Sequence, residues 1–195
     1  MKIRDCHDSY SSILAHLKRN AHKNRTAALI GQLLETHTHY DKTKIYYALD
    51  TYHRECIHFG IQNLSLADND LVAISDLDEI PSRHALLEFS TGKRYLDKPM
   101  VFEQNEYTYF LDYYRSSDWL GTIISPYKTI SKISLNTLRI DSKVKRDIVA
   151  KSPIRKGGYH FTTCGSIAEI RNKIESWAHQ EFNNKYILDN LEKKI

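Results

Sequence analysis

The sequence contains little cysteine, proline or glycine, with three, four and seven residues of these types in a chain of 195. So few prolines and glycines argue against a disordered chain. The cysteines, Cys6, Cys56 and Cys164, are odd in number, lie far apart and form no C-x-x-C pair. We therefore expect reduced thiols and no disulfide framework.

Long hydrophobic runs are also absent. No stretch is long enough to span a membrane, and the chain opens with the polar sequence MKIRDCHDSY, where a signal peptide would have an apolar region. We therefore expect a cytoplasmic protein without a membrane span. The net charge of +4 is small and the basic residues are scattered, which argues against nucleic acid as a partner. A small positive charge is compatible with an anionic ligand such as a nucleotide sugar.

The residues that are present predict a soluble globular chain, because 41% are hydrophobic and 27% are charged. The length suits one domain, which we expect to cover residues 1–195. Apolar residues at helical spacing predict helices over 9–19, 27–34, 44–66, 82–89, 129–138, 166–177 and 184–193. Short apolar or alternating runs predict strands over 2–6, 71–74, 101–114, 121–125 and 159–163, and the charged segment 139–152 is expected to be a surface loop.

The stretch 71–83, LVAISDLDEIPSR, combines an apolar run with three carboxylates, Asp76, Asp78 and Glu79. The run predicts a buried central strand that ends before Pro81, with the acids at its carboxyl end, where ligands of open α/β sheets bind. Three adjacent acids repel one another unless a positive group offsets them. An Asp-x-Asp pattern suits Mg²⁺ or Mn²⁺ carrying a phosphate-bearing ligand. The alternative is a solvated turn in which Asp76 or Asp78 caps the following helix.

Two further patterns have both a functional and a structural interpretation. The segment 101–114 alternates acids with aromatic residues, which fits the wall of a sugar site but also an edge strand with one half-exposed face. Arg54 and Glu55 lie off the apolar stripe of the helix 44–66. Arg54 faces either the acidic strand end or ligand phosphates, or it forms a solvated ion pair with Glu55.

The segment 155–158, Arg155-Lys156-Gly157-Gly158, joins two cations to two glycines. Glycine lets the backbone approach a ligand closely, and paired cations suit a diphosphate. We therefore expect this segment to contact a diphosphate group.

The motif SDLDEIPSR at 75–83 resembles the signature of glycosyltransferase family 17. Further regions agree with this resemblance in the right order: the helix carrying Tyr52–Glu55 upstream, then GGYHF (Gly157–Phe161) and KIESWAHQEFN (Lys173–Asn183) downstream. The resemblance extends over Lys44–Asn183. The family includes enzymes that add a β-1,4-linked N-acetylglucosamine to the core mannose of N-glycans, together with microbial members.

The resemblance implies a GT-A-like α/β fold, a single domain with a mainly parallel central sheet flanked by helices. Residues 44–183 would form the family-like part, and residues 1–43 a divergent or reduced donor-binding part. The resemblance also implies metal-dependent transfer of N-acetylglucosamine from UDP-GlcNAc to a glycan acceptor, with inversion. The expected partners are thus this nucleotide-sugar donor and the acceptor, and the expected cofactor is Mn²⁺ or Mg²⁺.

The same resemblance implies roles for particular residues. The implied metal ligands are Asp78, Asp76 and His160, with His179 as a second histidine candidate. The implied donor-binding residues are Asp76, Asp78, Glu79, Arg54, Arg155 and Lys156. An inverting displacement needs a general base for the acceptor proton, usually a carboxylate. The candidate bases are Glu181, which the HQEF match favours, and Glu106, Asp118 and Asp112.

Two other interpretations stay open. The segment before Lys44 is short for a nucleotide-binding βαβ unit, which needs about 30 residues or more. A non-catalytic protein that keeps the fold is therefore one alternative. The other is a phosphatase of the haloacid dehalogenase type, which also places Asp-x-Asp after an apolar strand. That class needs Thr or Val where Ile80 stands, and a later acidic pair that we do not find in the sequence.

Overall fold

The computed structural model describes residues 10–36, 45–91, 98–144, 146–177 and 179–194, so the strand expected at 2–6 lies outside the described residues. The chain divides into two compact units, one of Met1–Leu64 with Ile174–Lys185 and one of Ser65–Lys173 with Tyr186–Ile195. The expectation of a single domain stays a prediction. Within the described ranges, no helix combines the length and the apolar character needed to cross a membrane.

The first unit contains the helices α1 (Tyr10–Asn20), α2 (Arg25–Thr36) and α3 (Ile45–Gln62), which confirm the helices predicted from apolar spacing. The short 3₁₀ helix η2 (Gln180–Phe182) belongs to the same unit. Apolar residues at helical spacing give α1 and α2 one buried side each. The buried residues of this core are Ile13, Leu17, Ala27, Ile30 and Leu34.

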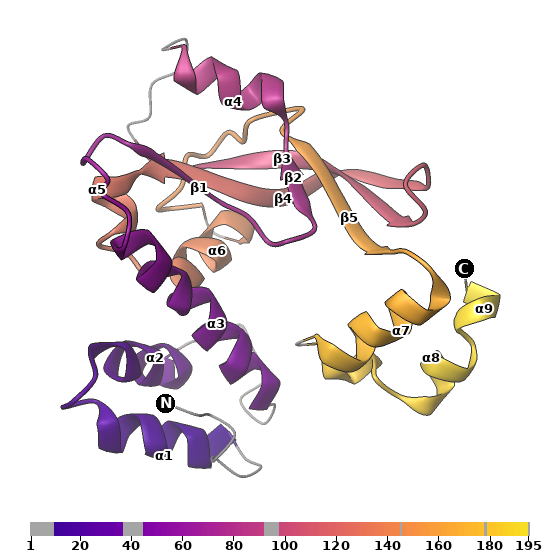
Figure 1. The fold of residues 1–195 in the computed structure, drawn as a ribbon, viewed down its shortest axis with the longest axis horizontal. Coiled ribbons are helices and arrows are strands. Elements are labelled where there is room, and N and C mark those ends of the chain that lie inside the picture. The colour runs from indigo at the N-terminus through magenta and orange to yellow at the C-terminus, as the bar shows by residue number, and fades with distance from the viewer. Residues whose placement is uncertain (1–9, 37–44, 92–97, 145, 178, 195) are drawn as a thin grey trace. The chain divides into compact units, whose positions relative to one another are not determined.

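The second unit contains a five-stranded sheet with helices beside it (Figure 1). Its strands are β1 (Leu71–Ile74), β2 (Glu79–Pro81), β3 (Met100–Tyr109), β4 (Tyr114–Pro126) and β5 (Gly158–Cys164). Its helices are α4 (Arg83–Ser90), α5 (Tyr127–Ile130), α6 (Leu135–Lys143) and α9 (Leu191–Lys194). The helices α7 (Ile167–Ser176) and α8 (Lys185–Asp189) carry residues of both units.

Helix α4 supplies part of the core of the second unit. Ser82 begins this helix, because its side chain accepts a hydrogen bond from the Ala85 N–H. The rings of Phe89 and Phe102 then meet edge to face, with centroids 6.3 Å apart. The buried residues of this core are Ala85, Phe89, Phe102, Ile124 and Ile154.

The sheet has the strand order β1-β4-β3-β5-β2 and is mixed. Only β3 and β5 pair in parallel, whereas β1–β4, β3–β4 and β2–β5 are antiparallel. The α/β class with flanking helices is confirmed, but the prediction of a mainly parallel sheet is wrong. One reason is the connection 110–113 between β3 and β4, which is far too short for a parallel crossover.

The connection between β1 and β2 requires the sheet to curl. These two strands are at opposite edges of the strand order, yet only residues 75–78 join them. In a flat sheet the two edges would be about 19 Å apart, because neighbouring strands are spaced by about 4.8 Å. The connection is shorter than that, because the Glu79 N–H donates to the Asp76 carbonyl at 3.0 Å and closes a turn. The curl therefore brings the two edges together and encloses one face of the sheet.

The enclosed inner face of the sheet is polar. Trp119 of β4 donates a hydrogen bond to Glu79 of β2 at 2.8 Å, although two strands separate β4 from β2 in the sheet. Gln104 and Thr122 are fully buried and hydrogen-bond to each other at 3.2 Å. Gly121 leaves the space for these side chains, since a Cβ atom there would lie 1.8 Å from Gln104 Oε1. The candidate site is built on this face.

Strand β1 is an edge strand and not the buried central strand that its apolar run predicts. Among the described strands it pairs only with β4, and its residues alternate between exposed and half-buried, with Leu71 42% exposed. A run of four apolar residues does not reveal where the strand lies in a sheet. The central strand is β3, so the edge-strand interpretation of 101–114 is also wrong. The acidic residues therefore lie in the connection that closes the curl.

The first residues of the segment 139–152 belong to α6, which ends at Lys143, so the prediction of a surface loop is wrong for this part of the segment. Asp141 and Ser142 of this helix are buried. The Asp141 carboxylate accepts hydrogen bonds from three backbone N–H groups of residues 147–149 at 2.9 to 3.0 Å. Polar residues continue the buried side of the helix after Leu138. The apolar spacing therefore ends at Leu138 and does not predict the rest of the helix.

Candidate active site on the inner face of the sheet

Three neighbouring strands place Glu79, His160 and Glu106 side by side. Glu79 of β2 is opposite His160 of β5, and His160 is opposite Glu106 of β3. Residues directly opposite each other have their side chains on the same face of a sheet. All three are buried, with exposed fractions of 3%, 4% and 6% in the order given. Charged side chains are rarely buried without partners, so each of these three side chains is expected to have a polar or charged partner.

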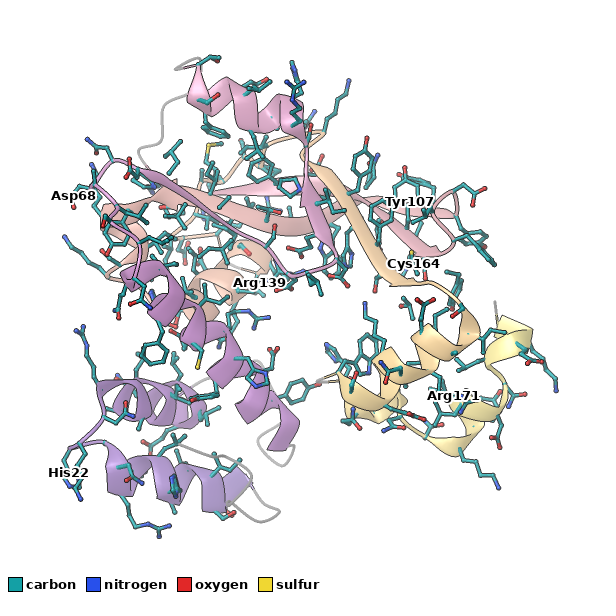
Figure 2. The ribbon with its side chains drawn as sticks, in the orientation of Figure 1. His22, Asp68, Tyr107, Arg139, Cys164 and Arg171 are labelled. Atoms are coloured by element: carbon teal, nitrogen blue, oxygen red, sulfur yellow. The ribbon has the colours of Figure 1, made fainter. Side chains whose placement is uncertain are left out.

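Arg139 of α6, labelled in Figure 2, holds two of the acids. Its Nη2 atom donates to Glu79 Oε1 at 2.5 Å and to Asp76 Oδ2 at 2.7 Å, while Nη1 donates to a backbone carbonyl of β4 at 2.8 Å. Glu79 also accepts hydrogen bonds from Trp119 Nε1 at 2.8 Å and from the Asp76 N–H at 3.2 Å. The Glu79 carboxylate is therefore paired on both oxygens, although its side chain is fully buried.

Sequence reasoning did not identify Arg139, although it did require a positive partner for the three acids. The residue lies in the part of α6 that was expected to be a loop. A signal was present, because Arg139 follows Leu135 by one helical turn, and both Leu135 and Leu138 are buried. Continuing the period past Leu138 would have placed the guanidinium against the sheet.

Asp78 pairs with a different cation. Lys173 Nζ of α7 lies 2.7 Å from Asp78 Oδ2, and His160 Nε2 lies 3.6 Å from Asp78 Oδ1. Burial raises the pKa of the Asp78 carboxyl, but the hydrogen bonds and charges of His160 and Lys173 outweigh burial and hold that pKa well below its usual range. Asp78 is therefore ionised at neutral pH. Lys173 was part of the family-like stretch in the sequence, but no role was expected for it.

The His160 imidazole lies between two carboxylates. Its Nδ1 atom is 3.8 Å from Glu106 Oε1, on the side away from Asp78, and has no hydrogen-bond partner among the described residues. Trp119 stacks on the imidazole, with ring centroids 4.0 Å apart and planes inclined by 16°. The ring is thus fixed in orientation with one buried nitrogen available, and an imidazole so placed can exchange a proton or bind a cation.

A pocket of about 280 Å³ opens beside Glu106. The Glu106 side chain is 9% exposed and accepts hydrogen bonds from Arg115 at 3.2 Å and from Ser116 at 3.3 Å. The lining residues are Glu106, Ser116, Asp118, Trp119, Leu120 and Lys143. Glu106 therefore reaches both the imidazole of His160 and a space that a ligand can enter. Of the other candidate bases, Asp118 lines this pocket but is exposed, and Asp112 is exposed and does not line it.

The acidic residues do not cap the following helix. Ser82 is the capping residue of α4, which contradicts the interpretation of Asp76 or Asp78 as caps in a solvated turn. The carboxylates instead pair with Arg139 and Lys173. The structure thus brings together Asp76, Asp78, Glu79, His160 and Glu106. They lie in the turn before β2 and on the strands β2, β5 and β3.

The basic segment 155–158 lies at the other end of β2 from Asp78. Gly158 is opposite Pro81, the last residue of β2, whereas Asp78 directly precedes its first residue. Gly158 has φ of +134°, and a Cβ atom there would lie 2.1 Å from the Ile80 carbonyl oxygen. This glycine therefore permits close contact between β5 and β2. The two cations of the segment are exposed, and their contact with a diphosphate stays a prediction.

Three further candidates, Arg54, His179 and Glu181, belong to the first unit. Arg54 pairs with Asp50 at 2.8 Å and its side chain is 14% exposed, and its contact with ligand phosphates stays a prediction. His179 Nδ1 lies 2.8 Å from Glu181 Oε1, and the Tyr47 hydroxyl donates to the same oxygen at 3.4 Å. Burial raises the pKa of the Glu181 carboxyl, but its backbone hydrogen bond and these partners lower it overall.

The family model of glycosyltransferase family 17 matches residues 9–194 of this chain. Because the match covers nearly the whole sequence, the protein belongs to glycosyltransferase family 17, and the resemblance seen in the sequence is confirmed. Searches of curated proteins and of solved structures found no match. Membership implies a glycosyltransferase with a sugar donor and an acceptor, and it does not agree with the phosphatase alternative.

The lowered pKa of Asp78 predicts a pH-dependent contribution to stability. An unfolded aspartate has a pKa of about 3.9, and the pKa of Asp78 in the folded protein is lower. The stabilisation is therefore fully present above the unfolded pKa and is lost as the pH falls through the folded pKa. We expect Asp78→Asn to lower the free energy of unfolding near neutral pH, and the difference from wild type to shrink below about pH 4. Urea denaturation across this pH range measures the effect.

Asp147→Asn is the matched control. Asp147 pairs with Lys151 at 3.1 Å, but both side chains are more than two-thirds exposed, at 70% and 73%. An exposed pair contributes little, so this variant should match wild type at every pH. A loss for Asp78→Asn that stays constant with pH would show that Asp78 is not the ionised partner of Lys173.

Proposed function

We propose that this protein transfers N-acetylglucosamine from UDP-GlcNAc to a hydroxyl group of a glycan acceptor, with inversion at the anomeric carbon and with a divalent metal. One observation carries the proposal. The ionised carboxylate of Asp78 lies next to His160, and His160 lies next to Glu106, a buried carboxylate beside a pocket. An inverting transferase needs such a division, with a charged donor side and a base on the acceptor side. The family supplies the class of reaction.

The donor side fits a metal that shares its shell with a ligand. Among the described residues, no group of three or more His, Cys, Asp or Glu side chains is arranged to hold a metal ion alone. Mg²⁺ commonly uses one or two protein carboxylates and completes its shell with phosphate and water oxygens. Asp78 and His160, which face each other, would hold such an ion, and Asp76 is held by Arg139 instead. When bound, the ion supplies positive charge for the diphosphate of the donor.

Lys173 completes the donor side. Its ammonium group lies 2.7 Å from Asp78 Oδ2 and so is a cation at the place where we propose the diphosphate binds. A Lys–phosphate pair is a charge-assisted contact and stabilises the negative charge of the leaving group. Arg155 and Lys156 were expected to have this role, and Lys173 is the better placed of the cations because it contacts the acidic stretch directly.

We assign the general base to Glu106. Its carboxylate takes the proton of the acceptor hydroxyl as that oxygen bonds to the anomeric carbon, and the bond to the diphosphate breaks with its electrons leaving on UDP. Support comes from the position of Glu106 on the pocket wall and from the hydrogen bonds of Arg115 and Ser116, which fix its orientation. Glu181, the base favoured by the sequence, has a side chain that is 41% exposed.

A non-catalytic protein is the second candidate, and one observation favours it. Asp76 and Asp78 already have cationic partners in Arg139 and Lys173 within the chain itself. The acids therefore do not require a metal or a ligand to be neutralised.

Calorimetric titration of UDP-GlcNAc with and without Mn²⁺ decides between the two candidates. We expect binding by the wild-type protein only with the metal, and no binding by Asp78→Ala, because this variant loses the carboxylate on the donor side. Asp147→Ala, on the surface, should bind as wild type does. A folded wild-type protein that binds no donor under either condition would favour the non-catalytic candidate.

The base is tested with Glu106→Gln and its rival Glu181→Gln. We expect Glu106→Gln to bind UDP-GlcNAc as wild type does but to lose transfer by about 10²–10⁴-fold, the usual contribution of a general base. Glu181→Gln should keep most of its transfer activity. The opposite pattern would assign the base to Glu181, and an α-linked product from wild type would contradict inversion.

A further inference from the structure

The Asp78 carboxylate has a different neighbour on each of its oxygens. Lys173 Nζ lies 2.7 Å from Oδ2, and His160 Nε2 lies 3.6 Å from Oδ1. Lys173 and Asp78 both belong to the second unit. Their side chains are 32% and 29% exposed, so solvent and solutes reach this ion pair. One half-buried carboxylate therefore has to serve both the ammonium group and any metal ion that binds here.

The space between Asp78 and His160 suits a divalent ion. Two groups that ligate one ion at about 2.1 Å lie between about 3.0 Å and 4.2 Å apart, depending on the angle at the ion. The separation of Asp78 Oδ1 and His160 Nε2, 3.6 Å, is within this range. The imidazole is buried and stacks on Trp119, with centroids 4.0 Å apart, so it keeps this orientation. The two groups thus fit an ion that is bonded to Oδ1.

An ion at this place would be close to the Lys173 ammonium group. The two cations would contact the same carboxylate and so lie no more than about 7 Å apart. They repel each other at this distance, and a half-buried setting screens the repulsion less than bulk water does. Asp78 supplies a single negative charge against the ion and the ammonium group together. The repulsion therefore weakens binding of a metal to the protein alone.

The other acids of the site do not offset this excess of positive charge. Asp76 and Glu79 are already paired with Arg139, at 2.7 Å and 2.5 Å. Glu106 is paired with Arg115 at 3.2 Å. Each of these carboxylates has its own cation, so the balance at Asp78 is decided by Lys173 and by what the ligand brings.

We infer that Lys173 makes metal binding conditional on the donor: its ammonium group weakens metal binding at Asp78 in the free protein and contacts the diphosphate in the complex. The inference rests on the proposed function, because the diphosphate of the donor supplies the negative charge that both cations need. The flexible stem of lysine lets the ammonium group reach a phosphate oxygen without a shift of α7. Coupling between two ligands is reciprocal, so metal and donor strengthen each other's binding by the same factor.

Lys173→Met tests this coupling, because it removes the charge and keeps much of the length of the side chain. Electron paramagnetic resonance of free Mn²⁺, at low ionic strength, measures Mn²⁺ binding without and with saturating UDP-GlcNAc, with protein-free samples as blanks. We expect the variant to bind Mn²⁺ alone at least about tenfold more tightly than wild type, since repulsion at about 7 Å has this size even in water. With UDP-GlcNAc the gain should disappear, so the factor by which the donor strengthens Mn²⁺ binding should fall at least about tenfold.

Two control variants separate the charge of Lys173 from other effects. Lys173→Arg keeps the positive charge and should bind Mn²⁺ alone as weakly as wild type does. Lys151→Met removes a lysine whose side chain is 73% exposed and pairs with Asp147, and it should match wild type with and without the donor. Damage to the fold would weaken Mn²⁺ binding, whereas we expect a gain. Urea denaturation checks that each variant is folded, and Lys173→Gln replaces Lys173→Met if the latter is not.

The inference is overturned if Lys173→Met binds Mn²⁺ alone no more tightly than wild type, or if Lys173→Arg shows the same gain as Lys173→Met. Calorimetric titration of UDP-GlcNAc on the same samples separates this failure from that of the proposed function. Metal-dependent donor binding with equal coupling factors in wild type and Lys173→Met would reject the inference alone. A folded wild-type protein that binds no donor with or without Mn²⁺ would reject the proposed function and the inference together.

Discussion

The hydrogen bonds from Arg139 to Glu79 and Asp76 are the interaction on which the rest of the second unit depends. The curl of the sheet encloses Glu79 completely, and a buried carboxylate that lacks a partner costs several kcal/mol. Such a pair adds little net stability, because the loss of hydration offsets most of the attraction. Its effect is to fix position, since a guanidinium donates in defined directions and so holds the turn against α6.

The remaining features of the site follow from this fixed turn. With Asp76 and Glu79 held, β2 pairs with β5 in a register that places Glu79 beside His160, and β5 in turn places His160 beside Glu106. Asp78 then meets His160 and Lys173. The proposed division between a donor side and an acceptor side thus rests on strand register and does not need a mobile loop. The polar inner face is what a curled mixed sheet offers in place of the strand ends of a parallel sheet.

Local features of the chain could be predicted, and long-range pairing could not. Apolar spacing predicted α1, α2 and α3, and the acidic turn stood out because three acids follow one apolar run. His160 was preferred to His179 as a metal ligand, which stays a prediction, and the structure places His160 next to the Asp78 carboxylate. The strand order was not readable, because four apolar residues give the same pattern in a central and in an edge strand.

The two cations of the site escaped sequence reasoning for a related reason. Arg139 is 60 residues from Glu79 in the chain, and Lys173 is 95 residues from Asp78. No periodic pattern connects positions so far apart. Both residues lie on helices whose buried or paired side is partly polar, so the apolar residues alone do not reveal them, and only an extended helical period points to Arg139. Family resemblance supplied the reaction class, but only the fold shows which charges neutralise the acids.

A double-mutant cycle on the free energy of unfolding tests the role of Arg139 most directly. Arg139→Met should lower it by about 3–5 kcal/mol, because it leaves Glu79 charged and buried without its cation. Adding Glu79→Gln to Arg139→Met should cost less than the two single changes together, with a coupling of about 0.5–3 kcal/mol. A loss below about 1 kcal/mol for Arg139→Met, the level of an exposed pair, with additive effects in the double variant, would contradict a central role for this interaction.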